Sequence, residues 1–232
     1  IEAATTRNGS VLTGNIVATA KDANYAGNDA YYVDDEGAFY TLSGTTFTKR
    51  QTVTADTFSL GVTDMVQFAL VTYATGTGRI QAIESADFVN LTDSFWSGLT
   101  ANVPHPLERV ENALYVGNKN IIGRITGLVS TTAAWCTLPT DVFITTLRKH
   151  PDGKNLIAFC NTAYDFESGS PVHKRGSQGR IYIIDTVTAT WIREIDIEMH
   201  VEGSKNLGGV IYVTYGSNVG YFNGNGITFL KK

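Results

Sequence analysis

Clustered carboxylates are the first residues in this sequence whose types and spacing could support chemistry. Asp34-Asp35-Glu36-Gly37 gathers oxygens of the kind that bind Ca²⁺. A calcium loop of the EF-hand type alternates its ligands and ends in a distant glutamate, and this stretch does neither. Asp and Gly are also the residues that hairpin turns select, so we interpret the stretch as a turn. Asp165 and Glu167 could form an acid–base pair, but nothing places a partner carboxylate at the separation that a glycosidase requires.

The side chains that could bind metals or act as nucleophiles lie apart from one another. The histidines are His105, His150, His173 and His200. They fall in different segments and form no metal-binding pattern, so we expect surface or loop-lining imidazoles. Cys136 and Cys160 have aromatic or apolar neighbours, which predicts buried free thiols rather than a reactive thiolate. A single disulfide between them is the alternative.

Sequence motifs of known catalytic sites are missing as well. No G-x-S-x-G elbow occurs, and Gly76-Thr-Gly78 lacks the third glycine of a nucleotide-binding loop. Asp185-Thr-Val-Thr-Ala-Thr-Trp191 resembles the repeated turn of sialidase propellers but lacks its glycine and is not repeated. We therefore predict that the chain is not an enzyme, with no catalytic residue, no metal site and no cofactor.

The composition indicates strands and excludes several classes of partner. The chain has 232 residues, of which 43% are hydrophobic and only 17% charged, with 23 Gly and 5 Pro. Abundant Thr and Tyr favour strands over helices. A net charge of -4 argues against a nucleic-acid-binding protein, which would show a basic patch. No apolar run approaches the roughly 18 residues of a membrane span. Because the sequence starts without Met, we expect a processed or excised part of something longer.

The elements that must position any functional residue have the pattern of β-hairpins. Residues 114–116 and 121–126 are expected strands, joined at 117–120 by Gly and Asn residues that tolerate positive φ. The pattern recurs along the chain. In the second recurrence we expect strands at residues 66–72, 79–83 and 88–91.

These hairpins are spaced as repeats. Aligned on their second strands, the equivalent residues are Tyr31, Phe68, Leu114, Leu156 and Ile211. A period of about 40–45 residues with four short strands per unit is the signature of β-propeller blades. Three expected third strands also share a Gly-Arg-Ile start, at residues 78, 123 and 179.

We therefore predict an all-β fold, a β-propeller of about five four-stranded antiparallel blades in a single domain spanning residues 1–232. The expected blades are approximately residues 15–55, 56–100, 101–141, 142–198 and 199–232. The alternative architecture is a β-sandwich or two small β domains. An open part of a larger ring would also show this spacing.

One long polar insertion, residues 161–178, interrupts the fourth repeat. It mixes aromatic residues, both signs of charge and turn formers, a composition that suits an interface. Long connections on compact scaffolds are functional or disordered. The predicted binding residues are Tyr164, Asp165, Phe166, Glu167, His173 and Arg175.

Several strings resemble blades in bacteriophage structural proteins, the propeller-like modules of tail, fibre or capsid-decorating proteins. They are Asn112-Ala-Leu-Tyr-Val-Gly-Asn118, Gly179-Arg-Ile-Tyr-Ile-Ile-Asp185, Ile211-Tyr-Val-Thr-Tyr-Gly216 and Gly220-Tyr-Phe-Asn-Gly224. The resemblance spans roughly residues 105–230 and implies a role in virion assembly or at the virion surface, with no catalytic residue.

The function expected from this resemblance is a non-enzymatic viral structural protein that mediates protein–protein interaction, assembly or host attachment. Its partners would be other virion proteins or a host surface receptor or glycan, within a homo-oligomeric assembly, and its location the virion or the extracellular space. The alternatives are a carbohydrate-binding or carbohydrate-cleaving propeller, and a scaffold propeller within a secreted cellular protein.

Overall fold

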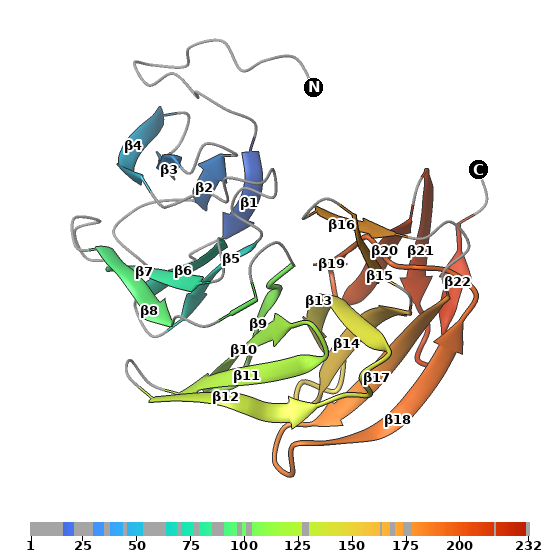
Figure 1. Ribbon diagram of the computed structural model, residues 1–232. Coiled ribbons are helices and arrows are strands. Elements are labelled where there is room, and N and C mark those ends of the chain that lie inside the picture. The colour runs from blue at the N-terminus through green and yellow to red at the C-terminus, as the bar shows by residue number, and fades with distance from the viewer. Residues whose placement is uncertain are drawn as a thin grey trace. The chain divides into compact units, whose positions relative to one another are not determined.

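In the computed structural model the chain is all-β, and its described strands form antiparallel sheets (Figure 1). The structure describes residues 16–20, 30–34, 38–43, 46–52, 64–68, 71–76, 79–84, 91–96, 99–100, 104–126, 130–162, 164–167, 170–173, 178–215 and 217–230. The chain divides into two compact units, residues 1–103 and residues 104–232.

The first unit contains two four-stranded sheets in which each strand pairs with the next along the chain. The first sheet comprises β1 (Ile16–Ala20), β2 (Ala30–Asp34), β3 (Ala38–Ser43) and β4 (Thr46–Thr52). The second comprises β5 (Asp64–Phe68), β6 (Val71–Gly76), β7 (Arg79–Glu84) and β8 (Leu91–Trp96).

The second unit contains three further sheets of the same kind. The third sheet comprises β9 (Leu107–Val110), β10 (Ala113–Asn118), β11 (Ile121–Thr126) and β12 (Ser130–Thr137). The fourth comprises β13 (Val142–Lys149), β14 (Leu156–Thr162), β17 (Gly179–Asp185) and β18 (Thr190–Ile197). The fifth comprises β19 (Gly203–Leu207), β20 (Val210–Tyr215), β21 (Asn218–Phe222) and β22 (Ile227–Phe229).

The predicted fold is confirmed: the chain is all-β and built from five four-stranded antiparallel sheets, one in each predicted repeat. Each sheet is a meander, because its strands pair in chain order once the β15–β16 insertion is set aside. The assignment of all 232 residues to a single domain stays a prediction.

Three details of the predicted strands are wrong. The strand expected at 66–72 is a hairpin, since Phe68 ends β5 and pairs with Val71 at the start of β6. Phe68 is therefore not on a second strand. No Gly, Pro or Asn marks this turn, so the sequence reads as one apolar run. The strand expected at 88–91 begins only at Leu91, and β19 went unrecognised because Gly203-Ser-Lys-Asn-Leu207 lacks strand formers.

The glycine of the predicted 117–120 turn has a different role from the one expected. Gly117 lies within β10, and the turn is confined to Lys119 and Asn120, where Lys119 has a positive φ of 57°. A Cβ at Gly117 would lie 2.9 Å from the Pro106 ring and 3.0 Å from Ile144. Glycine is thus required by close approach of neighbouring segments and not by the turn.

The shared Gly-Arg-Ile string does occur on the third strand of three sheets, but at different heights. Arg79 and Arg180 are each among the first two residues of their strands, whereas Arg124 is the fourth residue of β11. The three arginines therefore do not occupy one equivalent position. Their recurrence reflects a shared strand composition more than a shared register.

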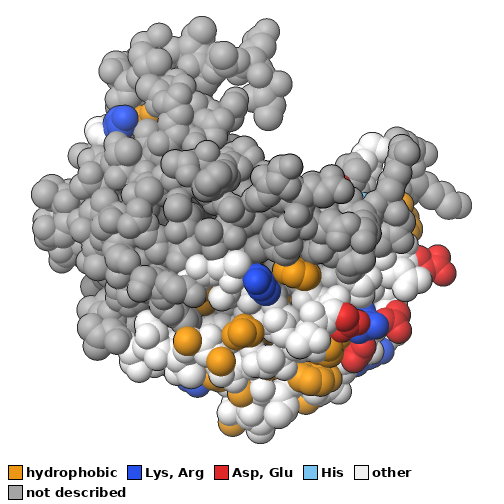
Figure 2. All heavy atoms as spheres, in the orientation of Figure 1, with side chains coloured by type: hydrophobic (Ala, Val, Ile, Leu, Met, Phe, Trp, Pro, Cys, Tyr) orange, Lys and Arg blue, Asp and Glu red, His pale blue; other side chains and the backbone are white. Residues whose placement is uncertain are grey.

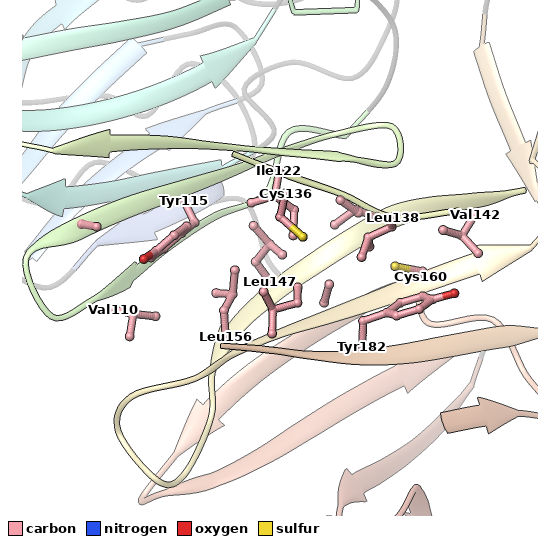
Figure 3. Close-up of a cluster of buried hydrophobic side chains, with 14 residues drawn as sticks. Val110, Tyr115, Ile122, Cys136, Leu138, Val142, Leu147, Leu156, Cys160 and Tyr182 are labelled. Atoms are coloured by element: carbon pink, nitrogen blue, oxygen red, sulfur yellow. The ribbon is translucent and has the colours of Figure 1, made fainter. Parts of the chain in front are cut away.

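The fourth sheet is covered on both faces by its neighbours. One face joins the third sheet through a cluster that includes Leu156, Ala158, Cys160, Tyr182 and Ile184 (Figure 3). The opposite face joins the fifth sheet through residues that alternate with these along the same strands: Ile157, Phe159, Ile181 and Ile183. Successive residues of a strand point to opposite faces, so continuous apolar runs are what a sheet buried on both sides requires.

Polar contacts join the same three sheets. Arg148 on β13 donates from Nη1 to Glu108 of the third sheet at 3.4 Å and from Nε to the Ser204 carbonyl of the fifth sheet at 3.1 Å. Thr146 shares a hydroxyl–hydroxyl hydrogen bond of 2.7 Å with Ser204. The third, fourth and fifth sheets are thus linked by side chains of one strand.

The surface of the described residues is low in charge, in agreement with the composition. On the face shown in Figure 2 most described side chains are uncharged, and acidic and basic groups gather near one edge. In the part of the chain that the structure describes, no helix is long and apolar enough to cross a membrane.

Candidate functional site

The predicted binding residues lie on a hairpin that is inserted into the fourth sheet. β15 (Tyr164–Glu167) and β16 (Ser170–His173) form a two-stranded sheet of their own between β14 and β17, which are hydrogen-bonded neighbours. The insertion was expected to be a long polar loop, and it contains regular structure instead. The structure brings five of the predicted residues onto this hairpin: Tyr164, Asp165, Phe166, Glu167 and His173. Arg175 lies outside the described residues.

The backbone register of the hairpin pairs residues of the two strands directly. Tyr164 lies opposite His173, and Phe166 lies opposite Pro171. Since alternate residues share a face of a strand, positions 164 and 166 belong to one face of the hairpin and positions 165 and 167 to the other. The hairpin therefore separates its aromatic positions from its acidic ones.

The base of the hairpin is held firmly by the fourth sheet. Thr162 donates its backbone N–H and its hydroxyl to the Gln178 carbonyl, at 2.9 and 2.8 Å. One residue further in, the fully buried Asn161 amide accepts the Val201 N–H at 2.8 Å and donates to the Val201 carbonyl at 3.2 Å. The hairpin thus leaves the sheet at a point that is also tied to the segment leading into the fifth sheet.

A group of charges surrounds Arg180, close to the hairpin base. Its Nη1 lies 3.1 Å from Asp141, and its Nε lies 3.1 Å from Asp196 and 3.6 Å from Glu194. These side chains reach solvent, where ion pairs contribute roughly 0–1 kcal/mol each. The cluster consequently fixes the guanidinium orientation more than it stabilises the fold.

A separate pocket of about 290 Å³ lies between the third sheet and the β17–β18 turn of the fourth. Its described lining consists of Val110, Glu111, Asn112, Ala113, Tyr115 and Arg124 from the third sheet, and Thr186 and Val187 from the turn. Tyr115 and Arg124 are direct partners across β10 and β11, so they share one face of the sheet. The sequence did not predict this site.

The electrostatics of the pocket centre on Arg124. Its Nε is buried, and no hydrogen-bond partner for it exists among the described residues. Burial raises the pKa of the Tyr115 hydroxyl, the Arg124 charge and the Thr186 hydroxyl lower it, and Glu111 raises it. The Tyr115 ring lies against Trp135, with centroids 4.7 Å apart. A cation and a buried phenol thus face each other across a pocket that both carboxylate and hydroxyl groups border.

The histidines are placed differently from one another. His105 is buried, against the expectation of a surface imidazole, because its Nδ1 pairs with the Gly117 carbonyl at 3.1 Å. His150 and His200 pair with acidic residues two positions later in the chain, at 2.9 and 3.2 Å. Within the described ranges, no three His, Cys, Asp or Glu side chains come together in an arrangement that could hold a metal ion.

Both cysteines are free and buried, as predicted. Burial raises the pKa of Cys136 to about 11 and that of Cys160 well above its ordinary value. A thiol is a nucleophile only when it is deprotonated. Both side chains therefore contribute to the core between the third and fourth sheets (Figure 3) and not to a reactive centre.

The pocket left only part of its signal in the sequence. The predicted four-residue turn at 117–120 would place Tyr115 opposite Ile122, whereas the observed two-residue turn places it opposite Arg124. A correct turn length would have found this pair. Thr186 and Val187 belong to another sheet, and no local pattern relates them to β10 or β11.

No family model matches the chain, and no curated protein matches it. Solved structures do share its fold. The GH74 enzyme of Niastella koreensis aligns with a TM-score of 0.62 at 16% identity, over 93% of this chain and 38% of that one. A chain of the nidogen/laminin complex aligns with a TM-score of 0.63 at 13% identity, over 89% and 74%. The hydrazine synthase of Kuenenia stuttgartiensis aligns with a TM-score of 0.61 at 10% identity, over 97% and 69%.

At such identities the likeness concerns the fold alone, and this chain spans 38% of the length of the GH74 chain. The four-stranded antiparallel sheets that follow one another along the chain, together with these structural neighbours, show a propeller-type fold.

Proposed function

We propose that this chain is a non-enzymatic interaction propeller whose β15–β16 hairpin binds a protein partner. The observation that carries the proposal is the insertion itself. Strands β14 and β17 pair along their length up to Asn161 and Gly179, so a tight turn would be enough to connect them. The chain instead builds a second small sheet at this position.

The composition and anchoring of the hairpin support this role. Aromatic residues are enriched in the buried centres of protein interfaces, and Tyr164 and Phe166 share one face of the hairpin. The acidic positions 165 and 167 share the other face. A rigid base at Thr162 and Asn161 lowers the entropic cost of presenting these residues to a partner.

The partner that we propose is a component of a virus particle or of its host's surface. The resemblance of several strands to blades of phage tail, fibre and capsid-decorating proteins supports a virion component that assembles as a homo-oligomer or attaches to the host. Its location would then be the virion or the extracellular space.

Replacing residues 163–177 by Asn-Gly tests the proposal, since this turn connects antiparallel strands directly. We expect the wild-type chain to form oligomers in sedimentation velocity, or to bind virus particles or host cells from the same source. The shortened variant should lose that association and keep the wild-type melting temperature. Val187→Ser, on the exposed β17–β18 turn, is the matched control.

Two results would overturn the proposal. One is a wild-type chain that stays monomeric and binds neither particles nor cells. The other is a shortened variant that associates as well as the wild type. A polyclonal antibody against the chain adds an independent test of the virion role, because it should label purified particles in electron micrographs.

A further inference from the structure

The pocket beside Arg124 differs from the other arginine sites of residues 104–232. Arg148 and Arg180 have carboxylate partners, and Arg193 donates to Asn225 and to a backbone carbonyl. Arg124 Nε is buried without a hydrogen-bond partner in the described part of the chain. Leaving a buried charged donor unpaired costs stability, so its presence suggests an acceptor oxygen that arrives with a ligand.

The neighbouring groups suit hydroxyls. The Thr186 hydroxyl donates its proton to the Lys154 carbonyl at 2.7 Å, which leaves its lone pairs as acceptors. The Tyr115 phenol and the Asn112 amide both donate and accept, and the Glu111 carboxylate accepts. A volume of about 290 Å³ with this many polar groups fits one polyhydroxylated ring.

The shape of the pocket is set by the protein alone. Tyr115 is buried against Trp135, and Glu111 adopts a left-handed φ of 50°, which is uncommon for a residue with a side chain. Such strain persists where the surroundings impose it, and binding sites are among those places. Val187, which is 89% exposed, adds an apolar surface at the mouth.

We infer that this pocket binds a single acidic monosaccharide unit, a uronic acid, with its carboxylate on Arg124 and its hydroxyls on Glu111, Asn112, Tyr115 and Thr186. The unpaired guanidinium nitrogen selects a carboxylate over a neutral group. Glu111 disfavours a doubly charged anion such as phosphate, whereas it accepts a sugar hydroxyl. The pocket shares no residue with the β15–β16 hairpin, so this inference and the proposed function can fail separately.

Calorimetric titration of the wild-type chain tests the ligand class without any substitution. The four probes are sodium glucuronate, its methyl ester, glucose and inorganic phosphate. We expect glucuronate to bind with a Kd in the millimolar range, and the ester and glucose to bind at least about tenfold more weakly. Equal binding of glucose and glucuronate, stronger binding of phosphate, or no binding of glucuronate would overturn the inference.

Substitution then locates the site. Arg124→Gln should weaken glucuronate binding about tenfold or more and leave glucose binding unchanged, while Lys205→Gln, the same charge change on the exposed strand β19, should have no effect. Circular dichroism checks that the variants fold. Asn112→Ala, on an exposed turn, decides the question if Arg124→Gln does not fold, because it should weaken binding several-fold. Unchanged binding in the folded variants would overturn the assignment.

Discussion

The fourth and fifth sheets share one topology but differ in how many of their faces are covered. Strands β14 and β17 are buried at nearly every position, with alternate residues facing the third and the fifth sheet. Strand β20 alternates instead: Ile211 and Val213 are buried, whereas Val210 is 39% exposed. Leu207 and Val219 are exposed as well. The same meander is therefore stabilised by two interfaces in one case and by one in the other.

This difference shows that the hydrophobic pattern of a repeat reports its neighbours as well as its own structure. A continuous apolar run requires a sheet on each side, because successive residues point in opposite directions. An alternating run requires a sheet on one side only. The experiments below test this contrast, from the largest expected effect to the smallest.

Removing a large side chain from the doubly covered sheet should have the largest effect. Phe159 is fully buried between the fourth and fifth sheets, where it meets Phe222 edge-on at a centroid distance of 6.2 Å. Phe159→Ala should lower the free energy of unfolding by about 3–5 kcal/mol, measured by urea denaturation. Leu207→Ala on the exposed face should change it by less than about 0.5 kcal/mol. Equal losses would contradict the contrast.

Breaking the buried amide contact between these sheets should rank second. Asn161→Ala leaves the N–H and the carbonyl of the fully buried Val201 without partners, at a cost of about 2–4 kcal/mol. The matched control is Asn206→Ala, since the Asn206 amide accepts the exposed Gly209 N–H, which water can satisfy. The prediction is wrong if both variants unfold at the same urea concentration.

Alkaline pH should weaken the interface of the fourth sheet with the third. An unfolded Cys136 loses its proton near pH 9.0, but the folded thiol holds it until about pH 11. The folded state then binds more protons, so stability falls as pH rises through this window. Between pH 9 and 10 the double variant Cys136→Ala, Cys160→Ala should show a flatter pH dependence of the unfolding midpoint. An unchanged slope would contradict the assignment to the thiols.

The turns of the two sheets should give the smallest and opposite effects. Ala189, in the β17–β18 turn, has a φ of 60°, whereas the β19–β20 turn places Gly208 at a φ of 61° with open space around it. Ala189→Gly should therefore stabilise the chain and Gly208→Ala destabilise it, each by about 0.5–1 kcal/mol. Thermal melting checks both, and shifts of the same sign would refute this account of the turns.

Much of the fold could be predicted from the sequence because turn chemistry is local. In the first sheet, Gly and Asp residues between short apolar runs placed β2 and β3 within one residue of their observed ends. The prediction failed where a turn lacked such residues, as between Phe68 and Val71. It failed again at β19, whose residues carry little strand propensity and form an edge strand by pairing with β20.

The candidate sites could be predicted to different degrees for the same reason. The insertion at 161–178 was visible as a break in the repeat spacing, and five of its predicted residues lie on one hairpin. The pocket was missed because it combines a cross-strand pair, Tyr115 with Arg124, and a turn from another sheet that carries Thr186. Only the register and the neighbouring sheet bring these groups together.

By itself the sequence determined that the chain forms short antiparallel strands in five similar units, because turn residues and apolar periodicity act over a few residues. The tertiary structure alone decided which faces of the sheets are covered and where an arginine and a phenol meet a hydroxyl from another sheet. Those outcomes depend on contacts between residues far apart in the chain, and such contacts leave no local trace.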